Sequence, residues 1–210
     1  LQGTIVTIDA MGTQTKIAET IRKGEADYVL CVKDNHPNLL DSIMFAGLGP
    51  EGALQPCSTD EVTATKPNHG RLEVRRCWAY DAVDRLYKHE QWKDIRSFAI
   101  IERERTEDGR TSIERAYYIS SLPADAARLA RAVRSHWEVE NRLHWCLDVQ
   151  LGDDQSRTRS GFAANNLAIV RHIVMNLLRL NTTSKVGIKN KRLMASASDE
   201  FRAEVLGFMT

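Results

Sequence analysis

The stretch "GTIVTIDAMGTQTKIAETIRKGEADYVLCVK", residues 3–33, contains the strongest indication of the fold. Its first seven residues are mostly β-branched or apolar and end on Asp9, which is typical of a buried strand. Thr13 is expected to cap a helix that Gly24 ends. Residues 26–33 then predict a second buried strand. A strand–helix–strand unit of about thirty residues predicts a parallel pair joined by a right-handed crossover, and hence an α/β fold.

The next segment predicts a helix and then a change to β structure. Asn35 is expected to cap a helix that has Pro37 in its first turn. Between residues 47 and 115 the pattern becomes strand-like, which indicates a β-rich insertion or a second sheet layer. The strands expected from alternation and β propensity are 71–80, 97–105 and 111–122, with a hairpin turn at 107–109.

Helices dominate the last third of the chain. Residues 123–148 contain no Gly and only an initial Pro, and they predict a helix with Ala126, Leu129, Val133, Trp137 and Glu140 at helical spacing. Residues 162–180 predict a long amphipathic helix, and a polar, basic, loosely held tail is expected after it. The domains expected from these changes are 1–46, 47–115, 116–180 and 181–210.

The composition is that of an ordinary globular protein. The 210 residues are 42% hydrophobic and 27% charged. They contain no run of eighteen apolar residues, the length that a membrane-spanning helix would need. Four cysteines without C-x-x-C spacing indicate a reducing, cytoplasmic setting. The chain starts on a strand without an initiating Met, which indicates that a segment precedes it.

Charge is unevenly distributed although the net charge is only +1. Residues 155–198 contain eight Lys or Arg and no Asp or Glu, and the remainder has 21 basic and 28 acidic residues. A basic region beside an acidic body is the pattern expected of a protein that binds a polyanion. A solvated basic tail would give the same count.

The segment "SHWEVENRLHW" at 135–145 allows three interpretations. On a helix His136, Glu140 and His144 share one face, but two His eight residues apart could not both reach one ion without a bend. The stripe could instead be structural, with its tryptophans buried. In the third interpretation Glu140 is an oxygen ligand for Mg²⁺ and its basic and aromatic neighbours contact a phosphate backbone.

The third interpretation requires another carboxylate, and Asp9 can supply it. Asp9 ends a strand of the parallel pair, so it is expected at the carboxyl edge of the sheet, where open α/β folds bind ligands. An Asp in this place could also simply begin a turn.

Several motifs together resemble a known family. "TIDAMGTQTKIAETIRKGEADYVLCVKDNHPNL", "HGRLEVRR", "YYISSL", "VRSHWEVENRLHWCLDVQLGDDQSRTR" and "NNLAIVRHIVMNLLR" closely resemble insertion-sequence transposases of the ISAs type, also known as H-repeat-associated proteins. The motifs occur in the family's order over nearly the whole chain.

The resemblance implies an α/β fold with a partial RNase H-like core. In this family three acidic residues, two Asp and one Glu, bind two Mg²⁺ ions, with Mn²⁺ as a possible substitute. Asp9 matches the second Asp and Glu140 matches the Glu. A basic side chain four residues before the Glu is common in related transposases, and here that position is His136.

The family's first Asp has no counterpart in this sequence, because it lies on a strand that would precede residue 1. The resemblance therefore implies that the isolated chain cleaves DNA poorly. A sheet without that strand would also expose an edge.

Several polar residues are candidates for DNA contact. Lys33 ends the strand beside that of Asp9, and Asn141 adjoins Glu140. The arginines on the strand at 71–80 could line a DNA path or pair with nearby acids, and those after Asp153 could clamp a phosphate or form local ion pairs. These arginines are Arg71, Arg75, Arg76, Arg157 and Arg159.

The function that these expectations favour is DNA transposition by metal-dependent strand cleavage and strand transfer. Its partner would be DNA, at transposon ends and target, with a homo-oligomer possible in a transposition complex and no membrane involved. The alternatives are a non-catalytic DNA-binding remnant and a nuclease or resolvase with an RNase H-like core.

Overall fold

The structure is a computed structural model of the 210-residue chain, and it describes residues 1–48, 54–66, 71–139 and 143–208. The described residues form two compact units, Leu1–His136 and Trp137–Thr210, which are here called unit 1 and unit 2. This division differs from the boundaries expected at residues 46, 115 and 180, which stay predictions.

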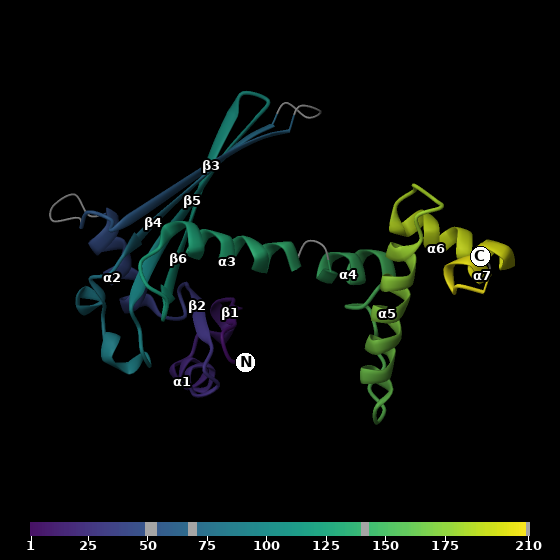
Figure 1. Cartoon of the computed structure of the whole chain (residues 1–210), viewed down its shortest axis with the longest axis horizontal. Coiled ribbons are helices and arrows are strands. Elements are labelled where there is room, and N and C mark those ends of the chain that lie inside the picture. The colour runs from purple at the N-terminus through teal and green to yellow at the C-terminus, as the bar shows by residue number, and fades with distance from the viewer. Residues whose placement is uncertain (49–53, 67–70, 140–142, 209–210) are drawn as a thin grey trace. The chain divides into compact units, whose positions relative to one another are not determined.

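Unit 1 is built on one six-stranded sheet of order β1-β2-β6-β5-β4-β3 (Figure 1). Only β1 and β2 are parallel, with Ile8 opposite Leu30, and all other neighbours are antiparallel. The strands are β1 (Ile5–Ile8), β2 (Asp27–Val32), β3 (Ser58–Lys66), β4 (Arg71–Tyr80), β5 (Ser97–Glu107) and β6 (Arg110–Ser120). The mixed α/β class and the parallel pair are thereby confirmed.

The strands from the β-rich segment join the sheet of the parallel pair, so the alternative of a second sheet layer is wrong. β6 pairs with β2, with Val29 opposite Ser120. β3 was not expected from the sequence, because "STDEVTATK" has little apolar alternation. Its position at the sheet edge explains this composition, since charged side chains at an edge strand suppress pairing with other chains.

Helices cover both faces of the sheet near β2. On one face α1 (Thr15–Lys23) and α2 (Pro37–Leu48) pack over Tyr28, Leu30 and Phe98. On the other face α3 (Ala126–Val139) packs Ala126, Leu129 and Val133 over residues that include Val29, Cys31 and Cys77. Short 3-10 turns, η1 (Ala10–Gly12), η3 (Val83–Arg85) and η4 (His89–Gln91), complete the unit. Because successive side chains of a strand point to opposite faces, the sheet has one apolar cluster on each face.

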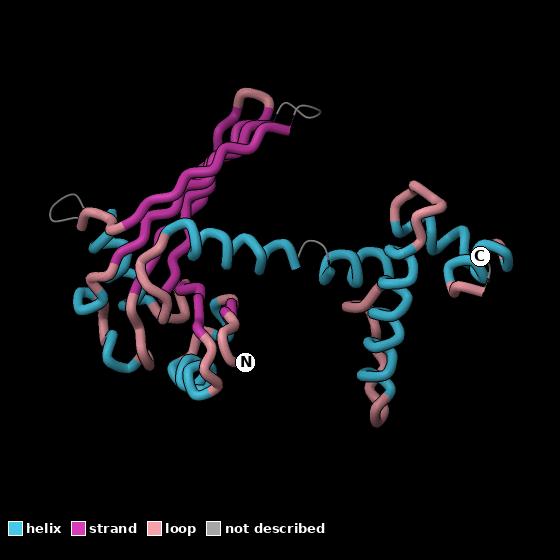
Figure 2. The backbone as a smooth tube through the Cα atoms, in the orientation of Figure 1, coloured by secondary structure: helices cyan, strands magenta, loops and turns pink. Residues whose placement is uncertain are grey.

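The far ends of β3–β6 extend beyond these helices (Figure 2). Ion pairs take the place of apolar packing there. Arg76 donates to Glu61 at 2.9 Å, to Glu104 at 2.7 Å and to Glu102 at 3.2 Å. Arg115 also donates to Glu102 at 2.8 Å, and the Glu102 side chain is only 8% exposed. Two guanidinium groups thus compensate the charge of a buried carboxylate.

Unit 2 contains four helices within the part of the chain that the structure describes. They are α4 (Trp145–Leu151), α5 (Ala163–Leu180), α6 (Ile188–Ala197) and α7 (Asp199–Val205). The segment expected as a loosely held tail therefore forms α6 and α7. Among the described residues, no helix is both long enough and apolar enough to cross a bilayer.

The buried ammonium of Lys191 joins α6 to the end of α5. It donates to the carbonyl of Leu178 at 3.1 Å and to that of Asn181. Carbonyls at a helix C-terminus lack partners inside the helix, and a cation there also complements the helix dipole. Asn181 in turn donates to Glu204 of α7 at 2.7 Å. These contacts join α6 and α7 to the end of α5.

Two expected helix caps are wrong. Thr13 donates its hydroxyl to the carbonyl of Cys31 at 2.6 Å, and α1 begins after Gln14 without a side-chain cap. The amide of Asn35 donates to the carbonyl of Ala10 at 2.7 Å. Both polar side chains hold the turn after β1 instead of capping helices.

Candidate active site

The carboxyl ends of the two parallel strands bring Asp9 and Lys33 together. Asp9 directly follows β1, and Lys33 directly follows β2. The Lys33 ammonium lies 3.1 Å from the Asp9 carboxylate, and the two side chains are 57% and 58% exposed. The pair is therefore within reach of a ligand from solvent, at the edge of the sheet where the sequence had placed it.

The turn that follows Asp9 is held from the loop after β2. His36 makes a 2.7 Å hydrogen bond with the carbonyl of Thr13, which adds to the bonds from Asn35 to Ala10 and from Thr13 to Cys31. These contacts join residues more than 17 positions apart, and they restrict the backbone on which Asp9 stands. A carboxylate on such a backbone is preorganised for binding a ligand.

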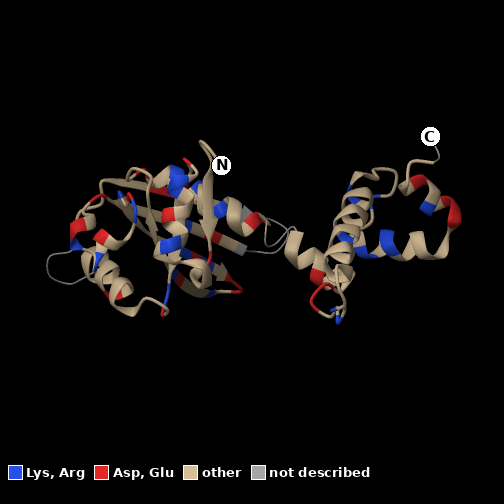
Figure 3. Ribbon diagram, turned by 90° about the horizontal axis from the view of Figure 1, so that it is seen from below, with Lys and Arg blue, Asp and Glu red and all other residues tan. Residues whose placement is uncertain are grey.

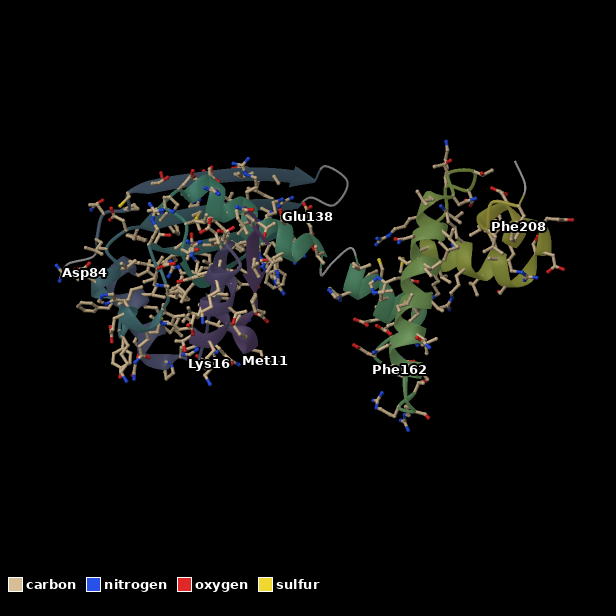
Figure 4. All side chains as sticks on the ribbon, turned by 60° about the horizontal axis from the view of Figure 1, so that its bottom comes forward. Met11, Lys16, Asp84, Glu138, Phe162 and Phe208 are labelled. Carbon is tan, nitrogen blue, oxygen red and sulfur yellow. The ribbon has the colours of Figure 1, made fainter. Side chains whose placement is uncertain are left out.

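Gly12 is required by close packing in this turn. A Cβ at this position would lie 2.4 Å from Cγ2 of Ile8, far below van der Waals contact. Ile8 itself packs against the α1 and α2 side of the sheet. A larger residue at position 12 would therefore displace the end of β1. The neighbouring Met11 is 89% exposed and points into solvent (Figure 4).

The surroundings of Asp9 favour its ionised form. The hydrogen bond from the Ala10 backbone N–H lowers the pKa of Asp9 most, partial burial opposes it, and Lys33 and His136 lower it further. The pKa therefore lies below its usual value of 3.8. A carboxylate that stays charged near neutral pH and remains half exposed is a suitable oxygen ligand for a divalent cation.

Cys31, which lies near this carboxylate, is not a comparable ligand. Burial raises the pKa of the Cys31 thiol to about 11, with a smaller opposing effect of Lys33. A thiol with this pKa is protonated near neutral pH, and only the thiolate binds metals well. Cys31 is a small buried side chain, whereas Cys146 is half-buried.

His136 approaches β1 from α3. Its Nδ1 lies 3.1 Å from the Thr7 hydroxyl, and it also lowers the pKa of Asp9 through its charge. Trp137, which was expected on the inward stripe of this helix, is 48% exposed, so the interpretation of buried tryptophans is wrong for this residue. The role of Thr7 was missed, although its alternation with Ile5 and Asp9 on one side of β1 could have indicated it.

Two of the predicted site residues, Glu140 and Asn141, lie outside the described residues. Among the residues that are described, no group of three or more His, Cys, Asp or Glu side chains could hold a metal ion. Asp9 is thus the one predicted metal ligand whose surroundings can be stated, and its pairing with Glu140 stays a prediction.

The arginines of β4 have carboxylate partners. Arg75 pairs with Glu73, and Arg76 pairs with Glu61, Glu102 and Glu104. This is the ion-pair alternative considered for these residues, and contact with DNA would have to compete with it. The side chain of Arg71 lies outside the described part of the chain.

The basic region at 155–198 is partly used for folding. Arg171 donates to Asp153 at 2.6 Å, Arg192 donates to the carbonyl of Gln150, and Lys191 is buried. Arg159 donates to carbonyls of its own loop, at Ser156 and Thr158. The exposed cations that form no ion pair with a described residue include Arg157, Lys185 and Lys189. Figure 3 shows the Lys and Arg of unit 2 along α5 and α6, with acidic residues on α7 and before α5.

Comparison with known proteins identifies the family of this chain. Residues 1–177 match the family described as transposase DDE domain. The protein YbfL of Escherichia coli (strain K12) is 35% identical over 213 residues, which cover 98% of this chain and 55% of YbfL. The H repeat-associated putative transposase YhhI of the same organism is 34% identical, with the same coverage. No solved structure matches with significance.

The fold, the strand-end Asp and these similarities define a protein of the DDE transposase class. The chain belongs to the transposase DDE domain family and is similar to the H repeat-associated members, as its motifs had indicated. It spans about half the length of the curated relatives it matches.

Proposed function

We propose that this chain acts in DNA transposition as the metal-dependent strand-cleaving and strand-transfer part of a transposase. Asp9 and Glu140 are the proposed catalytic carboxylates and metal ligands, and DNA, at transposon ends and target, is the substrate. The proposal deepens the family assignment, because membership alone does not say which residues of this chain do the chemistry.

The observation that carries the proposal is the state of Asp9. It stands at the carboxyl end of β1, its pKa is lowered, and a network of hydrogen bonds fixes the following turn. Mg²⁺ prefers one or two carboxylates per ion and keeps sites for water and phosphate oxygens. An ionised, half-exposed carboxylate beside a lysine meets these requirements.

Glu140 is proposed as the second ligand because of its place in the sequence. It follows His136 by four residues, and His136 is bonded to Thr7, two residues before Asp9. Four residues of chain span at most about 14 Å. The covalent chain therefore allows the Glu140 carboxylate to approach Asp9, and the charge of two carboxylates would bind divalent ions more strongly than one.

When bound, two Mg²⁺ or Mn²⁺ ions would polarise the scissile phosphate and make water or a 3′-hydroxyl a better nucleophile at neutral pH. The side chains of the protein orient the DNA for this chemistry. Lys33 lies beside Asp9, where its ammonium could contact a phosphate once a cation takes its place at the carboxylate.

Other proposed DNA contacts lie farther along the chain. Arg157 and Arg159 are exposed in the loop before α5, and Asn141 adjoins Glu140. His136 and the β4 residues Arg71, Arg75 and Arg76 complete the proposed set. Contacts to phosphates would position the DNA without reading its sequence.

The proposed fold in finer detail is a partial RNase H-like core with a β-rich insertion between Asp9 and the helical Glu140. The parallel pair β1 and β2 and the helix α3 would belong to the core, and the long ends of β3–β6 to the insertion. A homo-oligomer in a transposition complex is also part of the proposal. A transposase brings two DNA ends together, and two copies would suit that task.

The test is Mn²⁺ binding followed by electron paramagnetic resonance, combined with DNA nicking assays. Asp9→Ala is expected to weaken Mn²⁺ binding at least tenfold. Asp84→Asn, on η3 and well separated from Met11 of the turn after β1 in Figure 4, should leave it unchanged. The same Asp9→Ala change in a protein that includes any preceding segment should abolish nicking of the element's ends. Nicking that survives Asp9→Ala would refute the assignment.

The isolated chain is expected to nick poorly, since the family's first Asp has no counterpart in it. DNA binding with no Asp9-dependent Mn²⁺ binding would favour the non-catalytic remnant. Metal-dependent cutting without preference for the element's ends would favour the nuclease or resolvase.

A further inference from the structure

The last inward-facing residue of α3 in unit 1 is a histidine. Ala126, Leu129 and Val133 are buried on the sheet at intervals of three and four residues. Three residues after Val133, the next position on this face of the helix is His136, which is half-buried. An apolar side chain would continue the packing at this point. A hydrogen bond to β1 stands there instead.

The partner of this histidine is determined by the alternation of β1. Val6 and Ile8 pack with α1 and α2, whereas Ile5 packs on the side of α3. Thr7 lies on the same side as Ile5, and its hydroxyl is 3.1 Å from Nδ1 of His136. The strand thus presents one polar group to α3, two residues before Asp9.

The imidazole is also an electrostatic neighbour of Asp9, because its positive form stabilises the carboxylate. Lys33 approaches the same carboxylate from β2 at 3.1 Å. Asp9 therefore has Lys33 and His136 as neighbours, while the turn after it is bonded to the loop after β2. The hydrogen bond between Thr7 and His136 joins the side chains of β1 and α3.

We propose that His136 is a positioning residue, whose hydrogen bond to Thr7 holds the unit 1 part of α3 against β1 and so sets the geometry around Asp9. The proposal rests on the proposed metal chemistry for its functional consequence. It gives His136 a role within the protein in addition to the proposed DNA contact. Removing a residue that orients a metal ligand typically weakens metal affinity by about 10–100-fold.

Either protonation state of the imidazole can keep this bond. The threonine hydroxyl can donate to neutral Nδ1 or accept from the protonated ring. A change of pH would therefore not break the bond, and the test uses substitutions that remove the Thr7 hydroxyl or the His136 ring. Thr7→Val keeps the shape of the side chain without its hydroxyl, and Thr7→Ser keeps the hydroxyl as the matched control. His136→Ala removes the ring, and His136→Asn keeps a polar atom near the place of Nδ1.

The first measurement reads geometry without any metal. Nitroxide labels on cysteines introduced at Met11 and Ser135, both exposed in unit 1, report the separation of the turn after β1 from α3. Cys57 and Cys146 would be replaced by Ser, since Cys31 and Cys77 are buried. Thr7→Val and His136→Ala are expected to broaden the distance distribution measured by electron paramagnetic resonance. Thr7→Ser and His136→Asn should keep it narrow.

The second measurement is Mn²⁺ affinity in the same variants without labels. Thr7→Val and His136→Ala are each expected to weaken binding about tenfold, and the double variant should be no weaker than either single one. A purely structural role would lower the melting temperature in these variants and leave the Mn²⁺ affinity of the folded protein unchanged.

The outcomes separate this inference from the proposed function. Unchanged distance distributions in both Thr7→Val and His136→Ala would overturn it, whatever the metal affinity. Broadened distributions in a chain with no Asp9-dependent Mn²⁺ binding would support the positioning of α3 and refute the metal site. Broadened distributions with an unchanged, Asp9-dependent Mn²⁺ affinity would overturn the role of His136 at the site.

Discussion

Units 1 and 2 bury apolar side chains to very different extents. Unit 1 places two apolar clusters on the two faces of one sheet, and many of their members, such as Tyr28 and Phe98, are wholly buried. In unit 2 the buried apolar residues among those described are Leu147, Met175 and Leu178. Large exposed apolar residues of α5 include Ile169, Val170, Ile173 and Leu180.

Strands and helices differ in how fully their sequences specify the elements that pack on them. The register of a strand determines which residues of the neighbouring strand it pairs with. The alternation of its side chains then determines which residues are covered on each face. An amphipathic helix has an apolar side without specifying what covers it. The pattern of α5 predicted a helix, which is confirmed, but it contained no information on the surface that buries its apolar residues.

The largest expected effect comes from the core of unit 1. Phe98→Ala should lower the free energy of unfolding by about 3–5 kcal/mol, because a ring with no exposed surface is lost from its stack on Tyr80. Urea unfolding followed by the fluorescence of Trp92, a residue buried in the same cluster, measures it. The matched variant Ile169→Ala, at a residue 57% exposed, should change this value by at most about 0.5 kcal/mol. Equal losses of unfolding free energy in the two variants would contradict the difference in packing between units 1 and 2.

A smaller loss is expected from the buried cation of unit 2. Lys191→Met removes both hydrogen bonds to the end of α5, at about 1.5–3 kcal/mol for a bond to a charged group. Amide hydrogen exchange in α5 and α6 should accelerate, while exchange in β2 and β6 should not change. Lys189→Met, two residues earlier and exposed, is the control. Faster exchange in the control alone would contradict the assignment.

Asp9 should titrate below its ordinary pKa of 3.8. Its lowered pKa stabilises the fold above the unfolded value, and this contribution disappears as the pH falls through the folded value. The contribution is small because the side chain is 58% exposed. Titration of the carboxyl carbon by NMR measures the pKa. Lys33→Met should raise it, whereas Lys16→Met on α1 should leave it unchanged. An Asp9 pKa at or above 3.8 in the native protein would show that the surrounding donors do not act on it.

The smallest expected effect concerns an exposed cation of unit 2. Lys189→Met should leave stability unchanged and reduce the slope of log K for duplex DNA against log salt by about 0.9, the loss of one phosphate contact. Asn190→Ala, at the next exposed position, should not change the slope. Fluorescence anisotropy at several salt concentrations measures both, and a binding constant that does not change with salt in the native chain would refute DNA binding by this region.

Much of unit 1 could be predicted from the sequence because its signals are local. The strand–helix–strand pattern at 3–33 and the hairpin at Asp108 and Gly109, both in the left-handed region, are read from adjacent residues. The edge strand β3 was not predicted, because its charged residues leave little alternation of apolar and polar side chains. The wrong caps at Thr13 and Asn35 have one cause, since each side chain binds a backbone carbonyl that is distant in sequence.

For the candidate site, alternation and strand order could place Asp9 and Lys33 at one edge. They could not reveal the bond from Thr7 to His136, which joins residues 129 positions apart. The count of basic residues at 155–198 likewise could not distinguish a buried lysine from exposed ones. Lys191 and Lys189 have the same charge and similar neighbours in sequence. The packing of α6 on α5 buries Lys191 and leaves Lys189 exposed.

The pairing of β2 with β6 has a consequence for synthesis on the ribosome. Val29 lies opposite Ser120, so β2 leaves the ribosome about ninety residues before its antiparallel partner exists. At roughly 5–20 residues per second this interval lasts about 5–18 s. During that time the apolar strand "DYVLCV" has β1 on one side and no partner on the other. Chaperone binding to nascent chains should therefore peak before residue 120 is made and fall once β6 emerges.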